Sequence, residues 1–532
     1  FFFWVVYSYF NYDVQNDTKD SFTQEITSDP TPTLSFDFGN EWMKVCIEDP
    51  KSKDHLQLAL NQQAQRKTAS FLAFSKKQPT SRLFGDAASR MLRQDPSAVF
   101  RDLKSVLGHT MDSPIAQRFQ TVDHPLYNLS STSRNTVQFT VPSTGDVFTV
   151  EELAAMLLEH AQRFANDHSG STIVDTVLTV PPYFREDQIH LMKQVAQLAG
   201  LNVVSVITEL EAVAIDYSLR GHMEVKHKVI LFDVGTRTSS AALVEVSYDR
   251  GVLVRTLASE TSPYGGRDLD RLLAVYVDNK LDVQTKDPSG KTWDNLLLEA
   301  KKAKEFLSAS NFADIEVLQT PTRITREVFE SLAADTFMGM VQPLKKILQS
   351  ANASDITAVE LFGGGTRIPA LQALIQKETG ISVGKHINAD EAAALGACHH
   401  AAVLKKARFA RRVALINNLP KIASASPSVV LSSSEMEASK EKLEEWRARE
   451  QARELTLKQR SELESYVLDI KYKLDEISNS ADLEQLKAIL EQTNEWLERT
   501  TQEHQWKEYS HKLTEVKSQV EPILARNKNK EL

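Results

Sequence analysis

LSFDFGN (residues 34–40) and VILFDVGT (residues 229–236) decide the fold, because each is an apolar run that leads directly into Asp-x-Gly. The first triplet starts at Asp37 and the second at Asp233. Such a turn places a carboxylate where glycine lets backbone amides approach a phosphate, and the carboxylate can hold a magnesium ion through water. A single copy of this triplet usually indicates no more than a structural turn. Two copies after apolar strands predict a duplicated half-domain that surrounds a phosphate group.

From Leu34 to about Leu404, short strand-like runs alternate with helical patterns, which is typical of an α/β domain. A third run, VELFGGGTRIP (359–369), ends in three glycines that either expose backbone to a ligand or form a plain strand-to-helix turn. Gly265 and Gly266 have the same two interpretations. No P-loop ending in Gly-Lys-Ser/Thr and no dinucleotide fingerprint after a strand is present, which excludes those nucleotide folds.

The C-terminal part has a different pattern. Residues 406–440 include a Ser- and Ala-rich tract with little periodicity, which predicts a linker. Beyond it, apolar residues recur at three- and four-residue spacing in segments that begin near Leu463, Leu483 and Trp506. Short polar breaks separate these segments, so residues 441–526 are predicted to form an antiparallel helical bundle.

Composition excludes some functions. The chain has 62 Lys and Arg against 71 Asp and Glu, a net charge of −9, which removes the positive footprint that nucleic-acid binding needs. Its two cysteines, Cys46 and Cys398, lie far apart, so spacing shows neither a disulfide framework nor a Cys-based metal site. We therefore expect packing alone to hold the fold.

Both ends of the sequence carry features that resemble targeting signals. FFFWVVYSYF (1–10) is too short to span a bilayer and is typical of the core of a partial signal peptide, or alternatively of a buried segment or membrane-lying anchor. Residues 11–33 are polar and predict a mobile leader. The tail 527–532 ends in Asn-Lys-Glu-Leu, which resembles the lumenal retrieval signal except at Lys530. We expect the endoplasmic reticulum lumen, without stable membrane insertion. The sequons fit that compartment: Asn16, Asn128 and Asn352.

Two further polar residues are candidates. Lys104 in RDLKSVLG has a helical context, where a lysine is usually a solvated surface group. Glu209 in VITELEAVAIDY lies among apolar residues, either on the surface or buried for a purpose. Beside a bound triphosphate such a carboxylate could orient the attacking water.

Taken in order, DFGNEWMKV, RKTASFLAF, LFGDAASR, LTVPPYF, VITELEAVAIDY, LFGGGTRIP and INADEAAALGA resemble the 70-kDa heat-shock protein superfamily, specifically its large endoplasmic-reticulum branch. The resemblance covers about 34–405 and returns from about 440 to 524. It implies an actin-like, two-lobed α/β ATPase domain over 34–405, with magnesium ATP in its cleft, followed by an all-α lid.

Carried over position by position, the resemblance implies that Lys104 is the catalytic lysine and Glu209 the water-orienting acid. Asp37 and Asp233 are implied to hold Mg²⁺ through water, and Pro181 to couple nucleotide state to the rest of the molecule. Other positions implied to bind the nucleotide or close the cleft are Gly39, Asn40, Gly235, Thr236, Thr238, Gly265, Gly266, Lys304, Ser308, Gly363, Gly364, Arg367 and Asp390.

The chain departs from the family pattern at four positions. Asn40 replaces a hydroxyl residue, Arg237 stands where the family has a small residue, and Ser240 replaces an aspartate. Ile189 replaces an arginine that relays ATP binding between domains. These departures favour at most a weak ATPase. The segment between Arg412 and Lys440 is also too short for the family's peptide-binding β-sandwich.

The resemblance implies a chaperone that acts in protein folding, with nucleotide exchange for the lumenal 70-kDa heat-shock chaperone as the role its parts favour. Unfolded client proteins are a second implied partner class. Two alternatives stay open: a small-molecule kinase on the same core, and a degenerate scaffold.

Overall fold

The structure is a computed structural model, and it describes residues 31–75, 78–123, 126–220, 226–248, 251–281, 290–317, 320–350, 355–405, 413–417, 422–424, 429–499 and 506–528. The chain divides into two compact units. The first unit comprises residues up to Ser70 and Leu157–Ser426, and the second unit comprises Phe71–Met156 and residues from Pro427. The expected signal segment, residues 529–532 of the retrieval-like tail, Asn16 and Asn352 lie outside the described residues.

One mixed sheet of the first unit has the order β12-β11-β1-β2-β3, with β4 also paired to β2. Its strands are β1 (Thr33–Phe38), β2 (Trp42–Glu48), β3 (Leu56–Leu58), β4 (Thr68–Ala69), β11 (Asp175–Val180) and β12 (Asn202–Thr208). Every residue of β1 is buried, so both faces of this strand are covered. Because side chains alternate along a strand, Leu34 and Phe36 lie on one face, and Ser35 and Asp37 on the other.

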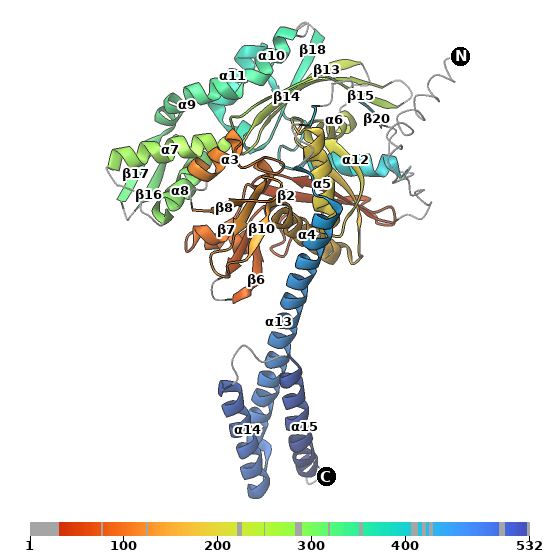
Figure 1. Cartoon of the computed structure of the whole chain (residues 1–532), viewed down its shortest axis with the longest axis vertical. Coiled ribbons are helices and arrows are strands. Elements are labelled where there is room, and N and C mark those ends of the chain that lie inside the picture. The colour runs from red at the N-terminus through yellow and green to blue at the C-terminus, as the bar shows by residue number, and fades with distance from the viewer. Residues whose placement is uncertain are drawn as a thin grey trace, which may run out of the picture. The chain divides into compact units, whose positions relative to one another are not determined.

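The other mixed sheet has the order β19-β18-β13-β14-β15-β20. Its strands are β13 (His227–Val234), β14 (Ser239–Ser247), β15 (Val252–Ser262), β18 (Ile356–Phe362), β19 (Val383–Gly384) and β20 (Val413–Asn417), and the central ones lie side by side in Figure 1. Phe232 packs into one buried cluster and Leu231 into another. A strand that is buried on both faces has a continuous apolar run in its sequence. VILF (229–232) in β13 is such a run.

The two sheets repeat one topology. β1 pairs antiparallel with β2 and parallel with β11, and β13 pairs antiparallel with β14 and parallel with β18. The turns repeat as well, because Gly39 N–H donates to the Trp42 carbonyl (3.0 Å) and Gly235 N–H donates to the Thr238 carbonyl (2.9 Å). The α/β class is confirmed, and its internal duplication extends to the hydrogen bond that closes each Asp-x-Gly turn.

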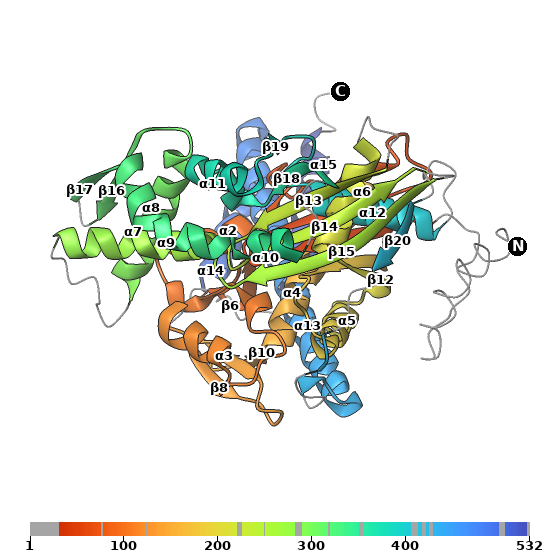
Figure 2. The same cartoon turned by 90° about the horizontal axis from the view of Figure 1, so that it is seen from above.

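Helices cover the two sheets (Figure 2). Helix α12 (Ala392–Leu404) packs against β1, β2 and α6 (Glu209–Arg220). The other helices of this unit are α5 (Glu186–Leu198), α7 (Gly266–Leu281), α8 (Lys291–Leu307), α9 (Arg326–Met340), α10 (Gln342–Ser350) and α11 (Pro369–Thr379), with a small hairpin of β16 (Phe312–Val317) and β17 (Thr320–Thr325). Within the described residues, no helix combines the length and the apolar character needed to cross a membrane.

A disulfide joins Cys46 of β2 to Cys398 of α12, with 5.9 Å between their Cα atoms. Both residues are fully buried. The disulfide corrects the expectation that packing alone holds the fold. Sequence spacing could not show it, because the partners are 352 residues apart and meet only once α12 lies on the sheet.

The second unit begins with two small antiparallel sheets, ordered β6-β5-β7 and β10-β9-β8. Their strands are β5 (Leu72–Ser75), β6 (Gln78–Phe84), β7 (Val99–Phe100), β8 (Asn128–Ser131), β9 (Val137–Thr140) and β10 (Val147–Thr149). Short helices α2 (Gly85–Met91) and α3 (Pro114–Arg118) accompany them, and α4 (Val150–Ser169) runs on into the first unit. Aromatic rings fill the core, where Phe100 and Phe139 meet edge to face at 5.5 Å.

The C-terminal helices are α13 (Ser433–Lys473), α14 (Ser480–Arg499) and α15 (Trp506–Lys528). The last part of α13 packs with α14 and α15 around a common apolar core that includes Leu463, Leu490 and Val520 (Figure 1). C-terminal helices after the α/β part are confirmed. Two elements lie within the expected linker 406–440, because β20 pairs with β15 and α13 already begins at Ser433.

A sequence signal for the earlier start of α13 exists. Ser432 and Glu435 form a capping box, in which each side chain bonds the backbone N–H of the other residue. Ser-x-x-Glu before a helix is the pattern of this motif. In a serine-rich tract, however, a Ser-x-x-Glu pattern also arises by chance.

Candidate functional site

The first Asp-x-Gly turn carries an ion pair. Lys44 of β2 lies directly opposite Asp37 of β1, and its Nζ is 2.7 Å from the Asp37 carboxylate. Burial alone would lower the pKa of Lys44, but the charge of Asp37, its hydrogen bond and the charges of Asp390 and Glu209 leave that pKa raised. Lys44 therefore stays a cation. Sequence reasoning missed Lys44, although it lies in the same segment DFGNEWMK, on the strand that follows the Asp37 turn.

The second turn is packed so tightly that glycine is required beside it. Gly363 has φ +78°, and a Cβ there would lie 2.2 Å from Asp233 Oδ1. A Cβ on Gly265 would lie 2.6 Å from the Arg237 backbone. Around Gly364, in contrast, no atom of the described residues other than its chain neighbours lies within 4 Å of an added Cβ. The glycines thus bring β18 and the following turn against Asp233 while leaving open space at Gly364.

Glu41 joins the two turns within the first unit. The Thr236 hydroxyl donates to Glu41 Oε2 (3.2 Å), and Lys301 of α8 forms an ion pair with Glu41 Oε1. The centre of the neighbouring Trp42 ring lies 4.9 Å from the Lys67 ammonium group and 5.6 Å from that of Lys301. Turns of both sheets and helix α8 therefore meet at one place.

The remaining candidates of this unit lie around those turns. Lys304 pairs with Asp270 (2.6 Å) and donates to the Gly266 carbonyl (3.0 Å). Ser308 donates to the Lys304 carbonyl (3.3 Å), and Gly266 N–H donates to the Gly235 carbonyl (2.9 Å). The structure thus links three predicted positions, Lys304, Ser308 and Gly266, to the second turn.

Asp390 lies beside the glycine run. Gly363 N–H donates to the carbonyl of Ala389 (3.0 Å), and the Asp390 carboxylate pairs with Arg367 (2.8 Å) and Lys67 (3.6 Å). Burial would raise the pKa of Asp390, but the Arg367 hydrogen bond and both cations keep it below its ordinary value. Asp390 is therefore a paired carboxylate.

Glu209 begins α6, and Tyr183 lies near it. Burial, then the charge of Glu209, raises the pKa of Tyr183 well above its ordinary value, while a hydrogen bond with Thr238 opposes the shift. Asp233 and Arg237 also act on this phenol. Tyr183 is a neutral hydroxyl among the predicted site residues, and it was missed although it stands in LTVPPYF.

Lys104 belongs to the second unit, in a short 3₁₀ turn (Leu103–Ser105), and it is buried rather than a solvated surface group. Its catalytic role stays a prediction. In the first unit Pro181 is buried directly after β11, and Ile189 is half-buried on α5. The coupling roles assigned to those two positions also stay predictions.

The first unit's residues fit a nucleotide better than a metal ion. Asn40 Oδ1 is buried without a hydrogen-bond partner among the described residues, and Gly364 faces open space. A turned amide there could donate to a phosphate. Asp37, however, is engaged by Lys44. Among the described residues, no three His, Cys, Asp or Glu side chains gather as metal ligands would. Lys44 thus occupies the carboxylate for which the Mg²⁺ role was expected, and a water-mediated Mg²⁺ contact of Asp37 stays a prediction.

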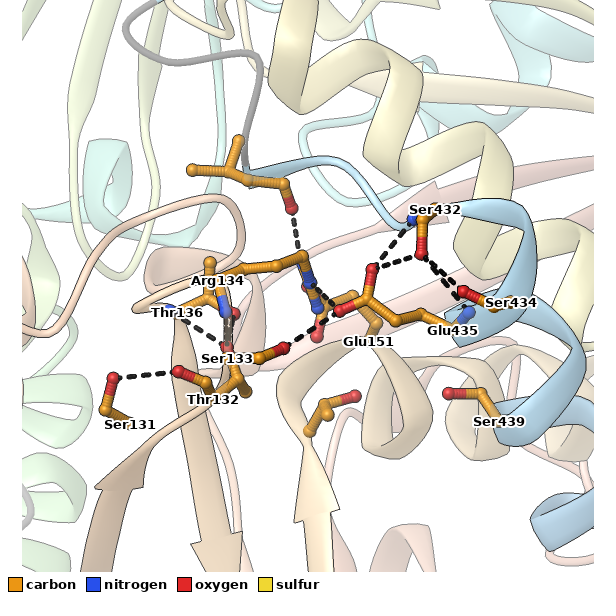
Figure 3. Close-up of polar contacts among 12 residues, drawn as sticks. Ser131, Thr132, Ser133, Arg134, Thr136, Glu151, Ser432, Ser434, Glu435 and Ser439 are labelled. Atoms are coloured by element: carbon orange, nitrogen blue, oxygen red, sulfur yellow. Dashed lines mark hydrogen bonds and ion pairs between the residues drawn. The ribbon is translucent and has the colours of Figure 1, made fainter.

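In the second unit, α13 is attached to the small sheets by a polar network centred on Arg134 (Figure 3). The Arg134 guanidinium donates to Glu151 (3.1 Å), to Glu435 (3.1 Å) and to the Val429 carbonyl. Burial raises the pKa of Glu151, and Arg134 opposes the shift. Glu435 also caps α13 through Ser432, so one carboxylate ties the helix start to the sheet.

Contacts continue along the same face of α13. Ser439 donates to Glu152 (2.9 Å), and Lys442 pairs with Glu152 (2.7 Å). The Trp446 ring meets Phe74 at 5.4 Å and Phe148 at 5.7 Å, which is edge-to-face packing. One turn later Glu450 accepts from the fully buried Arg82 side chain (2.8 Å). The helix therefore presents a continuous stripe from Glu435 to Glu450 to residues 71–156.

The repeated sheets and the paired Asp-x-Gly turns define an actin-like nucleotide-binding protein. A family model described as "Hsp70 protein" matches residues 33–423, and the chain belongs to the Hsp70 family. The fold of that family implies ATP binding, whereas Mg²⁺ is not shown.

Curated relatives agree with that assignment. The chain is 32% identical over 403 residues to hypoxia up-regulated protein 1 of Xenopus laevis, covering 70% of this chain and 61% of the relative. It is 31% identical over 408 residues to hypoxia up-regulated protein 1 of Homo sapiens (71% and 40%). It is also 32% identical over 386 residues to a heat shock 70 kDa protein of Neurospora crassa (70% and 58%). The matched part thus spans between 40% and 61% of these relatives.

Proposed function

We propose that this chain is an ATP-binding protein of the endoplasmic reticulum lumen that serves protein folding as a nucleotide-exchange partner of the lumenal 70-kDa heat-shock chaperone. ATP acts chiefly as a ligand that stabilises the first unit, and its hydrolysis is slow. The compartment is supported by the Cys46–Cys398 disulfide, since disulfides persist in oxidising compartments.

The observation that carries the proposal is the double attachment of α13. Its first half is held on residues 71–156 by Arg134, Trp446 and Arg82, and its last part forms the core of the three-helix bundle. A helix held at both ends is a fixed arm rather than a mobile lid. Exchange activity needs such an arm and a nucleotide-stabilised body, and it needs no peptide groove.

Direct peptide holding has less support. Only residues 418–432 separate β20 from α13, and a β-sandwich built from strands of about five or six residues needs several times that length. We therefore place client binding second to exchange.

Stopped-flow release of a fluorescent ADP from the lumenal chaperone tests the proposal. The full chain with ATP is expected to accelerate release in proportion to its concentration. The variant Arg82→Ala/Trp446→Ala removes two of the contacts that hold α13 on residues 71–156 and is expected to lose most of that acceleration. Arg499→Ala is the control, because Arg499 forms a local ion pair with Glu495 on the exposed surface of α14. If the wild-type chain gives no acceleration across a titration, the exchange function is wrong.

A further inference from the structure

The position opposite the turn aspartate differs between the two halves of the first unit. In the first half Lys44 faces Asp37, and in the second half Ser240 faces Asp233 at the same hairpin register. Ser240 shares a hydrogen bond with the Thr261 hydroxyl (3.0 Å). The duplicated turns are therefore alike in backbone but not in charge, since only the first carries an ammonium group opposite its carboxylate.

Lys44 is held in place and largely removed from water. It stands on a central strand, its side chain is 14% exposed, and that of Asp37 is 9% exposed. An exposed lysine can swing into solvent, but here the ammonium lies 2.7 Å from a carboxylate that is itself buried. Withdrawing either charge alone would leave the other without a partner, which is costly in a protein interior.

Three other acids around the turns have cations of their own. Glu41 pairs with Lys301, Asp270 with Lys304, and Asp390 with Arg367. Lys44 is thus the cation assigned to Asp37, and the charges of Asp390 and Glu209 also act on it. A polyphosphate that approaches the first turn meets a carboxylate that the protein has already neutralised.

We propose that Lys44 is a resident cation of the nucleotide site, which neutralises Asp37 and presents an N–H donor to the phosphates of a bound nucleotide. The inference rests on the proposed binding of ATP to the first unit. An ammonium carries three donors and acts on phosphate as a compact point charge. In this chain it performs at Asp37 the neutralising role that a metal ion would otherwise have to perform. Nucleotide binding therefore depends less on Mg²⁺ than a site with a free carboxylate would require.

Equilibrium binding of a fluorescent ATP analogue to the full chain, in Mg²⁺ and in EDTA, tests this assignment. The wild-type dissociation constant is expected to change by less than about tenfold when Mg²⁺ is removed. Lys44→Met is expected to weaken binding at least about tenfold in EDTA, because a charge-assisted hydrogen bond to phosphate is lost. Added Mg²⁺ should restore much of that loss.

Lys228→Met is the matched control, because Lys228 is also a strand lysine paired with an aspartate (Asp355, 3.1 Å) and lies at the opposite end of β13 from Asp233. The ratio of its dissociation constants in EDTA and in Mg²⁺ should equal that of the wild type. The double variant Asp37→Asn/Lys44→Met removes both charges, and serves if the single variant unfolds. It should bind less tightly than the wild type in EDTA.

The outcomes separate this inference from the proposed function. A wild-type chain that binds the analogue only with Mg²⁺ overturns the assignment of Lys44 and leaves ATP binding in place. A chain that binds under neither condition overturns both. Equal ratios for Lys44→Met and the wild type also contradict a cationic role for Lys44.

Discussion

The two halves of the first unit share a topology and a turn but differ in what stabilises them. The first half has a disulfide from β2 to α12 and an ion pair at its Asp-x-Gly turn. The second half has no second cysteine pair, has Ser240 rather than a lysine opposite its turn aspartate, and presses Gly363 against Asp233. A duplicated backbone can therefore be maintained by covalent and ionic links in one copy and by close glycine packing in the other.

Removing the disulfide should have the largest effect on this comparison. Cys46→Ser/Cys398→Ser is expected to lower the free energy of unfolding of the first unit by about 4 kcal/mol, because the bond closes a very long loop in the unfolded chain. Urea unfolding followed by intrinsic fluorescence measures the change. Since both sulfurs are buried, the native wild-type protein should resist mild reductant. An unchanged midpoint for the double variant would show that the bond does not stabilise the first unit.

The second half can be disrupted through its glycine contact. Gly363→Ala adds a Cβ 2.2 Å from Asp233 Oδ1 at a φ of +78°, so we expect a loss of about 3 kcal/mol from strain and overpacking, and with it most ATP-analogue binding. Thermal unfolding and fluorescence titration measure the two effects. Gly364→Ala, where the added atom has open space, should leave the melting temperature unchanged. Equal effects of the two substitutions would contradict the packing described around Asp233.

A smaller effect is expected where the two halves meet. Lys301→Met removes the ion pair with Glu41, a partly buried pair worth about 1 kcal/mol, and should speed dissociation of a fluorescent nucleotide about fivefold. Stopped-flow displacement provides the rate. Lys302→Met on the same helix is the control, because Lys302 is an exposed side chain whose ion pair with Glu299 is local to the helix. The swap Glu41→Lys/Lys301→Glu should recover part of the lost residence time, and its failure would argue against the pair.

The smallest expected effect depends on pH. Glu48 lies opposite Thr33 in the first half, where the second half has Val244 opposite Val229. Burial raises the pKa of Glu48 to about 7, and Lys405 opposes the shift. The folded chain therefore keeps a proton that the unfolded chain releases at lower pH, so this group makes stability fall as pH rises toward and through 7.

Glu48→Gln removes that dependence. The melting temperature of the variant relative to the wild type should rise between pH 5 and pH 8, by a few degrees at most. Differential scanning calorimetry across that range measures it. A constant difference between the two proteins would mean that Glu48 does not titrate in this window.

Much of the fold could be predicted because its signals are local. Apolar runs ending at Asp37 and Asp233 predict strands and turns, and apolar spacing near Leu463 and Trp506 predicts helices. The glycines at 363–365 predict a turn after a strand, and glycine is needed at Gly363 because of its φ and its contact with Asp233; whether that turn exposes backbone to a ligand stays a prediction. The start of α13 was missed, although its capping box is local.

Which charged side chains form ion pairs with one another could not be predicted in the same way. Lys44 is seven residues from Asp37, yet their contact depends on the hairpin register that the Gly39 turn sets. Glu41 and Lys301 are 260 residues apart, and Arg134 and Glu435 are 301 apart. No local pattern selects one lysine or glutamate from the many in the chain.

By itself, the sequence determined the strands, the duplicated turns, the C-terminal helices and the family, because hydrophobic period and turn chemistry act over a few residues. Only the tertiary structure decided which charges meet, that Cys46 reaches Cys398, and that the first half of α13 lies on residues 71–156. The physical reason is that ion pairs and disulfides need atoms a few ångströms apart. Those distances follow from how strands and helices pack, which no short stretch of sequence specifies.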